Sequence, residues 1–114
     1  MTTNPYLTRT PRHGQKSERR VVKKMGARRT IASGATDRQK GDGSTRKALI
    51  EAKATVKRSY SVKQETLEKL RLQALQEGKY PVLAVSFVTG DGRSIRNGDF
   101  VVLPLSVYQI LCSE

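Results

Sequence analysis

Glu51 and Lys53 stand two residues apart in a largely apolar stretch, Ala48-Leu-Ile-Glu-Ala-Lys53. If this stretch is a strand, alternation places Glu51 and Lys53 side by side on one face, together with Leu49. The other face then carries Ala48, Ile50 and Ala52. A carboxylate binds metals or moves protons, and an ammonium group beside it stabilises negative charge. Taken alone, the triplet favours a simpler interpretation, an ion pair on an exposed sheet.

Asp42 is a second carboxylate, placed between two glycines in Lys40-Gly-Asp-Gly43, nine residues before Glu51. Two carboxylates that arrive from neighbouring strand ends, with a lysine beside them, form the hard-oxygen ligand set that Mg²⁺ prefers. On its own, Asp42 fits a turn flanked by glycines equally well.

Glu18 is a third carboxylate, in a basic stretch that is predicted to be helical. Helix positions 18, 21, 22 and 25 share one face, and three of them are Val21, Val22 and Met25. We therefore expect Glu18 at the N-terminal edge of the buried stripe, where a carboxylate is costly unless it is paired or binds a metal. A role in capping or in stabilising the helix dipole explains Glu18 equally well.

The first half of the chain is expected to position these residues on a helix, on two strands and on the loop between the strands. The helix runs from Ser17, as N-cap, to a stop at Gly26. A short strand over residues 28–32 leads into a polar loop over residues 33–46, with one more short strand near Asp42. A second strand, residues 48–53, follows.

The second half is predicted to contain a helix over residues 64–76, ended by Gly78. Its apolar stripe consists of Leu67, Leu70 and Ala74, widened by Leu72 and Leu75.

Residues 81–88 form a run rich in β-branched side chains, which is typical of a central strand. Asp91-Gly92 and Asn97-Gly98 are turn dipeptides, so we expect the chain to return as a strand over residues 99–103. A closing helical turn is expected over residues 106–111. This order predicts an α/β or α+β domain on a mixed sheet.

Charge is distributed unevenly over the 114 residues, whose formal net charge is +12. Residues 1–63 carry 17 Lys and Arg against 4 acidic residues, whereas residues 64–114 carry 5 against 6. Such a basic protein is expected to bind nucleic acid. A flexible basic arm fits residues 1–14, but in residues 15–63 charge and apolar pattern alternate, as expected within a folded domain, residues 15–114.

Several classes of protein are excluded by composition. The longest apolar run is far shorter than the roughly 20 residues of a membrane-spanning helix. The N-terminus lacks the apolar stretch of a secretory signal, so a cytoplasmic location is expected. With one cysteine, Cys112, and one histidine, His13, the chain has neither a disulfide framework nor a closed Cys/His zinc site.

The order of these motifs resembles the PD-(D/E)xK nucleases, and more narrowly the archaeal and phage Holliday junction resolvases. That branch has a basic helix with a glutamate, an arginine-bearing strand, a Ser-Gly loop, a loop aspartate, an E-x-K strand, a Ser/Tyr segment before a long helix, and an apolar strand. The matching segments are Lys16–Arg19, Arg28-Arg29, Ser33-Gly34, Gly41-Asp42, Ile50–Thr55, Ser59–Gln64 and Pro81–Val88. The sequence departs from the family at Gly41, where a proline is usual, and at Gly43, where an aliphatic residue is usual.

The resemblance implies a restriction-endonuclease-like core, a mixed central sheet flanked by helices. It also implies an endodeoxyribonuclease that cleaves four-way DNA junctions as a homodimer, with Mg²⁺, for which Mn²⁺ would substitute. Asp42 and Glu51 would bind the metal with the Ala52 carbonyl, and Glu18 would complete the site directly or through water. Lys53 would orient or deprotonate the attacking water.

Basic residues around this site would contact DNA: Arg19, Arg20, Arg28, Arg29, Lys40, Lys57, Arg58 and Lys63. The dimer surface is expected on residues 103–111 or on the helix over residues 64–76. If phage-encoded, the protein would act in the host cytoplasm. Two alternatives stay open: a non-catalytic basic DNA- or RNA-binding protein, and another PD-(D/E)xK activity, such as a nicking or end-processing nuclease.

Overall fold

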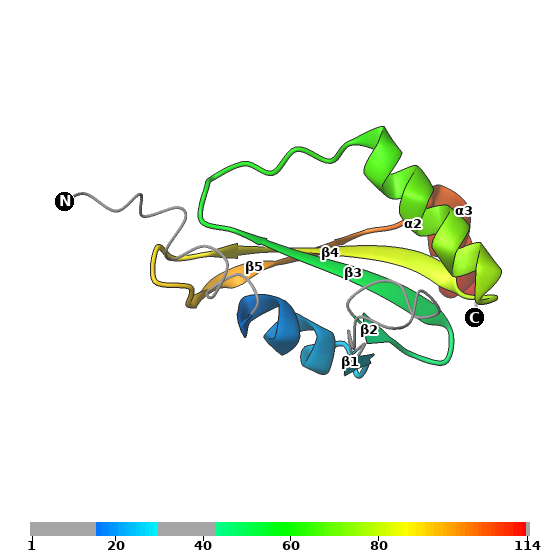
Figure 1. Cartoon of the computed structure of the whole chain (residues 1–114), viewed down its shortest axis with the longest axis horizontal. Coiled ribbons are helices and arrows are strands. Elements are labelled where there is room, and N and C mark those ends of the chain that lie inside the picture. Colours follow the sequence, from blue (N-terminus) through cyan, green and yellow to red (C-terminus); the bar gives the residue numbers. More distant parts are fainter. Residues whose placement is uncertain (1–15, 30–42, 114) are drawn as a thin grey trace, which may run out of the picture.

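The computed structural model describes residues 16–29 and 43–113 of the chain. Over these residues the protein is an α/β domain in which helices cover both faces of a mixed sheet (Figure 1). The helix of residues 16–24, hereafter the N-terminal helix, is followed by β1 (Arg28–Arg29), β2 (Gly43–Ser44), β3 (Ala48–Thr55), α2 (Gln64–Gln76), β4 (Tyr80–Val88), β5 (Ser94–Val102) and α3 (Leu105–Ser113). No helix in these two ranges has the length and apolar character needed to cross a membrane.

The sheet has the strand order β1-β2-β3-β4-β5, with a parallel pair at its centre. β3 and β4 run parallel, in a register from Ala48 opposite Tyr80 to Thr55 opposite Phe87. β1, β2 and β5 join by antiparallel pairing. A parallel pair needs a crossover connection, and α2 supplies it. The central position predicted for residues 81–88 is therefore confirmed, and the predicted short strand near Asp42 is β2.

Two hydrophobic clusters lie on the two faces of the sheet. On one face Val21 and Val22 of the N-terminal helix pack with Ile50 and Ala52 of β3 and with the β4 residues Val82 and Ala84. On the other face Leu70 and Ala74 of α2 pack with Leu49, Leu83 and Val85. The alternation predicted for residues 48–53 is confirmed, and β4 is buried on both faces because helices cover both of them.

The N-terminal helix lies against the sheet through the predicted stripe. Gly26, with φ +73°, ends the helix in the left-handed conformation that glycine adopts without steric cost, as the sequence predicts. The prediction that Ser17 is the N-cap is wrong, because Ser17 lies within the helix and is buried. Its hydroxyl instead accepts a hydrogen bond from the Arg20 guanidinium at 3.4 Å.

α2 has the predicted bounds, and Leu67, Leu70 and Ala74 face the sheet. The prediction that Leu72 and Leu75 widen its buried face is wrong, since both are exposed. At 3.6 residues per turn, Leu72 lies nearly opposite Leu70, so α2 buries only a narrow stripe.

The hairpin between β4 and β5 turns at Asp91-Gly92, as predicted, with Gly92 at φ +87°. The prediction of a second turn at Asn97-Gly98, before a strand over residues 99–103, is wrong, because β5 already begins at Ser94. Asn97, at φ +58°, lies where the pairing jumps from Ser86 opposite Asp99 to Val88 opposite Ser94. The ladder between β4 and β5 is therefore irregular at this point, and asparagine is one of the few non-glycine residues that readily adopt a positive φ.

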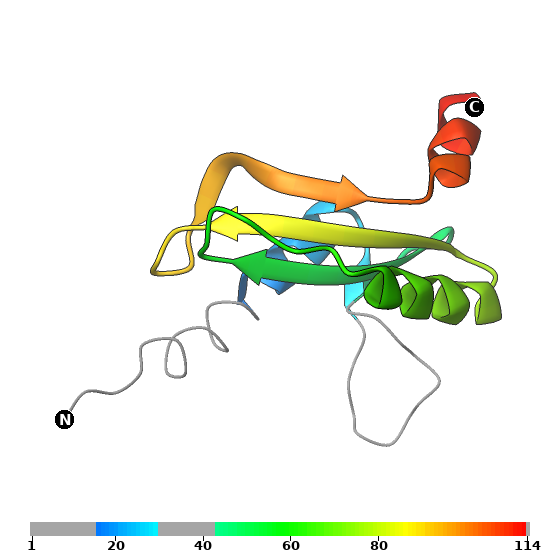
Figure 2. The same cartoon turned by 90° about the horizontal axis from the view of Figure 1, so that it is seen from above.

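The predicted closing turn is a nine-residue helix, α3, which follows β5 and lies beyond the β5 edge of the sheet (Figure 2). Val107 is its only buried residue, whereas Leu105 is 71% exposed and Tyr108 is 57% exposed. Ile110 and Leu111 are exposed as well. α3 therefore presents a largely apolar surface.

The predicted arm, residues 1–14, lies outside the described residues, as do residues 30–42, which include the end of the predicted strand over residues 28–32, most of the predicted loop, and Asp42.

Candidate functional site

Glu51 and Lys53 lie on the face of β3 that α2 covers. Their neighbour Leu49 is buried against Leu70 and Ala74 of that helix, whereas Ile50 and Ala52 face the N-terminal helix. Glu51 Oε2 lies 3.3 Å from Lys53 Nζ, and the two side chains are 25% and 42% exposed. The predicted juxtaposition is confirmed: a half-buried carboxylate and an ammonium group meet on one face of the strand.

A pocket of about 660 Å³ opens between this part of β3 and α2. Its lining consists of Glu51, Lys53, Tyr60, Ser61, Lys63, Thr66, Lys69, Leu70 and Gln73. Three lysines and one glutamate thus line the pocket, together with three residues that carry a hydroxyl group. The pocket is therefore positively charged and rich in hydrogen-bond donors.

The helical period explains how α2 builds its side of the pocket. Lys63, Thr66, Leu70 and Gln73 recur every three or four residues, so they share one face of the helix. Leu70 is buried and anchors that face on the sheet, while Lys63 lies at the extended N-cap position, with φ −91° and ψ 139°. The same packing that forms the core therefore fixes the polar groups above β3.

Glu18 belongs to the N-terminal helix, which lies on the opposite face of the sheet from α2 (Figure 1). Its side chain is half-buried and is not among the residues that line the α2 pocket. Within residues 16–29 and 43–113, no three His, Cys, Asp or Glu side chains form a group that could hold a metal ion. The predicted ligand Asp42 lies outside these ranges, so the convergence of three carboxylates stays a prediction.

Gly43, the residue that follows Asp42 in the sequence, lies in β2. Gly43 pairs with Ile50, which is the residue before Glu51, and Ser44 pairs with Leu49. Gly43 is buried, and a Cβ atom at this position would collide with Val22 Cγ1 and lie 3.0 Å from the Arg28 carbonyl oxygen. This close approach accounts for a glycine at position 43.

The residues predicted to contact DNA are placed differently from one another. Exposed side chains are found at Arg19, Arg28, Lys57, Arg58 and Lys63. The Arg20 guanidinium is half-buried and engaged within the protein, and its predicted contact with DNA stays a prediction. The Arg29 side chain and Lys40 lie outside what the structure describes.

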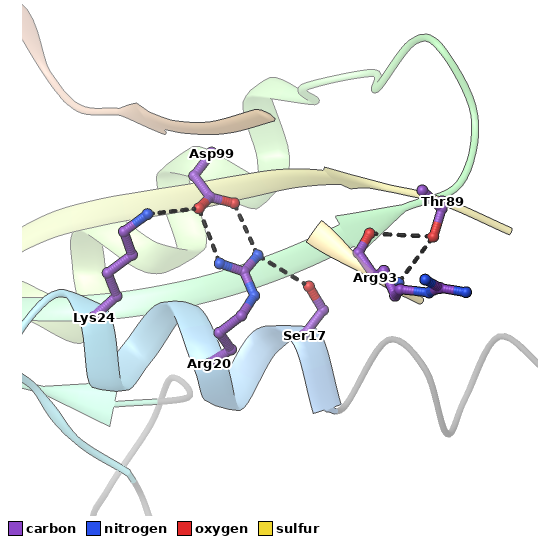
Figure 3. Close-up of polar contacts among 6 residues, drawn as sticks. All are labelled: Ser17, Arg20, Lys24, Thr89, Arg93 and Asp99. Carbon is purple, nitrogen blue, oxygen red and sulfur yellow. Dashed lines mark hydrogen bonds and ion pairs between the residues drawn. The ribbon is translucent and has the colours of Figure 1, made fainter. Parts of the chain in front are cut away.

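Arg20 is held by Asp99 of β5, to which it donates two hydrogen bonds of 3.0 Å (Figure 3). Lys24 Nζ lies 3.4 Å from the same carboxylate. The hydrogen bonds from Arg20, with the contribution of Lys24, hold the pKa of Asp99 well below its usual range. This cluster fastens the N-terminal helix to the edge strand.

A second pocket, of about 760 Å³, lies next to this cluster and is lined by Lys16, Ser17, Arg20, Asp91, Gly92, Arg93 and Ser94. Asp91 accepts hydrogen bonds from Thr89 and, at 2.7 Å, from Arg93, which together lower the pKa of Asp91 to about 2. The acidic and basic side chains that line this second pocket are thus partly paired with one another.

Lys69, Ser61 and Thr66 are pocket residues that sequence reasoning missed. Lys63, Thr66 and Lys69 recur every three residues at the start of a helix whose buried stripe was correctly predicted. That spacing indicates that Thr66 and Lys69 lie near Lys63 on the helix surface, since side chains three residues apart occupy neighbouring positions, but it does not indicate which surface faces β3 and gives no signal for Ser61.

No family model, curated protein or solved structure matches this chain.

Proposed function

We propose that the protein is a Mg²⁺-dependent endodeoxyribonuclease that cleaves four-way DNA junctions and has a restriction-endonuclease-like core. The observation that carries this proposal is the Glu51–Lys53 pair, 3.3 Å apart in a positively charged pocket. Hydrolysis of a phosphodiester needs a carboxylate to hold a divalent cation, a group to orient water, and positive charge around the phosphate.

The order of the elements supports this interpretation. A basic helix with Glu18 is followed by an arginine-bearing strand, the strand with Glu51 and Lys53, a segment with Ser59 and Tyr60, a long helix and an apolar strand. This is the order that the resemblance to the resolvases implies. The mixed central sheet with helices on both faces agrees with the expected core.

The donor set fits Mg²⁺ through hard oxygen atoms. Glu51 supplies a carboxylate that faces the pocket, and the Ala52 carbonyl is the proposed backbone ligand. Asp42 is the proposed second carboxylate: it is bonded to Gly43, whose partner Ile50 is bonded to Glu51. When bound, the cation would activate water and neutralise developing charge, and Mn²⁺, which also accepts oxygen ligands, would substitute.

Lys53 is the proposed catalytic lysine. In the free protein its ammonium group offsets the charge of Glu51, and 42% of its side chain is exposed. With DNA bound, the same group would lie beside the phosphate, where it would orient the attacking water and stabilise negative charge. Glu18 would complete the site directly or through water, a role that requires it to reach β3 from the opposite face of the sheet.

Branched DNA and a second copy of the chain are the proposed partners. The net charge of +12, whose positive excess lies entirely in residues 1–63, favours a polyanion. Leu105 and Tyr108 are exposed on the apolar surface of α3. Because a large exposed apolar surface marks an interaction site, this surface favours contact with a second copy of the chain. A dimer that forms through α3 would leave the positively charged pocket between β3 and α2 free for DNA. We propose a cytoplasmic location, which in a phage-infected cell is the host cytoplasm.

One observation favours a non-catalytic DNA- or RNA-binding protein. Lys53 neutralises Glu51, the only carboxylate among the described residues that line the pocket, so the pocket as described suits phosphate binding without chemistry. Another PD-(D/E)xK activity, nicking or end processing, would use the same residues on a different substrate.

The test is a cleavage assay on a synthetic four-way junction with Mg²⁺, beside linear duplex and single-stranded controls. We expect junction cleavage that stops with a chelator and returns with Mg²⁺ or Mn²⁺. A Glu51→Gln protein, purified in the same way, controls for contaminating nucleases. Tight junction binding without cleavage would establish the non-catalytic alternative, and equal cleavage of linear duplex would establish the other nuclease activity.

A further inference from the structure

The pocket has more lysines than are required to balance the charge of Glu51. Lys53 already pairs with Glu51 at 3.3 Å. Lys63 and Lys69 line the same pocket, are exposed, and form no ion pair within the described part of the chain. Two lysines that line the pocket therefore have no ion-pair partner among residues 16–29 and 43–113.

The acidic residues of α2 do not compensate these lysines. Glu68 accepts hydrogen bonds from Arg71 at 2.5 and 3.0 Å, and neither residue lines the pocket. Glu65, one turn before Lys69, makes no ion pair with it in the described structure. The charge of Lys63 and Lys69 is thus available to an anion.

Hydroxyl groups complete a set of donors. Ser61, Thr66 and Tyr60 line the same pocket as Lys63. Ammonium and hydroxyl donors are the groups that proteins use to bind phosphate oxygens in DNA. The pocket volume of about 660 Å³ has room for more than one phosphate group.

We propose that Lys63 and Lys69, with Ser61 and Thr66, bind a backbone phosphate adjacent to the one at Glu51 and Lys53. The binding of this phosphate does not depend on the proposed function, but cleavage beside it does. The subsite lies on the α2 side only, so it would fix which way the strand runs through the pocket. Cleavage would then require an intact phosphate on one side of the cut.

The first test measures binding, so it does not depend on catalysis. The probe is a short single-stranded oligonucleotide, titrated against wild type, Lys63→Gln, Lys69→Gln and the control Lys23→Gln. Lys23 is an exposed lysine of the N-terminal helix, on the other face of the sheet. Each pocket variant should weaken binding about tenfold and lower the salt slope by about one, because one phosphate contact is lost.

Two results of this titration would overturn the proposal. In one, the control weakens binding as much as the pocket variants do, so the pocket contributes only general charge. In the other, inorganic phosphate binds in the pocket and is lost in the variants, while oligonucleotide binding is unchanged, so the ligand is free phosphate rather than DNA.

The second test places the phosphate. A methylphosphonate replaces one charged phosphate at a time beside the cleavage point of a junction. Cleavage by wild type should slow about tenfold when the phosphate at one position is replaced. Lys69→Gln should lose less at that position, because one of the two lysine contacts to this phosphate is already missing. An equal loss in both proteins would contradict the subsite. Pocket-dependent binding without any cleavage would instead leave the subsite standing and reject the nuclease.

Discussion

Arg20 of the N-terminal helix and Asp99 of β5 form a two-pronged ion pair, with both N–O distances at 3.0 Å, across 79 residues of sequence. The side chains are 33% and 23% exposed, so solvent screens the pair only in part. The N-terminal helix otherwise packs on β3 and β4. This pair is therefore its polar attachment to the edge strand β5.

Asp99→Asn should lower the free energy of unfolding by about 1–3 kcal/mol, the range for hydrogen bonds to charged groups. A double-mutant cycle with Arg20→Met, followed by urea unfolding, measures the coupling of the two side chains. Lys24→Met is the control, because Lys24 is 69% exposed and its longer contact with Asp99 should contribute less than about 1 kcal/mol. Independent, additive effects of Arg20→Met and Asp99→Asn would contradict this attachment.

The same pair predicts how stability depends on pH. The pKa of Asp99 is lowered in the folded state, so its contribution is complete above the unfolded-state value of about 4 and is lost as pH falls below it. Wild type should lose stability more steeply than Asp99→Asn between about pH 4 and pH 2. Urea midpoints at pH 7, 4 and 3 measure the difference. Parallel acid profiles of the two proteins would contradict the ionised pair.

Gly43→Ala should lower the free energy of unfolding by about 1–3 kcal/mol, as overpacking does. The added Cβ would collide with Val22 Cγ1 and press on the Arg28 carbonyl oxygen at 3.0 Å. Val22→Ala makes room, so the double variant should be more stable than the sum of the two single changes predicts. Strict additivity would show that the helix does not approach β2 this closely.

Leu105→Gln and Tyr108→Gln should each weaken self-association about tenfold, the loss expected for a large side chain within an interface. Analytical ultracentrifugation over a range of concentrations measures the dissociation constant. Leu75→Gln, at an equally exposed position of α2, should leave it unchanged. Interfaces of standard size have dissociation constants of about micromolar or below, so a wild type that stays monomeric at about 100 μM would contradict the dimer.

Local patterns were sufficient to predict the elements that carry Glu51 and Lys53. Alternation over residues 48–53 depends on the strand period alone, and the stripe of Leu67, Leu70 and Ala74 depends on the helix period alone. Both were therefore readable from the chain, as was the glycine that ends the N-terminal helix. Each of these features is determined by residues that are neighbours in sequence.

Placements that depend on distant parts of the chain were not predicted, whereas the errors at Ser17 and at Leu72 and Leu75 are local. Asn97-Gly98 suits a tight turn, but pairing with β4 on both sides of this dipeptide places it inside β5, at an irregularity of the ladder. Ser17 suits an N-cap, but it lies within the helix and is buried beside Arg20. Lys69 became a pocket residue only because α2 lies over β3, a placement that no local pattern specifies.

Glu51→Gln should abolish junction cleavage while junction binding is kept or tightened. The loss of a metal-binding carboxylate removes several kcal/mol of transition-state stabilisation, which is about 10³-fold in rate. Binding should tighten because the Glu51 carboxylate, which now offsets Lys53, repels DNA phosphates. Asp42→Asn should behave in the same way if it is the second ligand.

Glu65→Gln makes the same chemical change on an exposed position of α2 outside the pocket, so its cleavage rate should match wild type. Single-turnover cleavage and gel-shift binding on one junction separate the two effects, since only chemistry should fail in Glu51→Gln. If Glu51→Gln cuts at the wild-type rate, Glu51 is a structural partner of Lys53, and the metal site must be sought among other carboxylates.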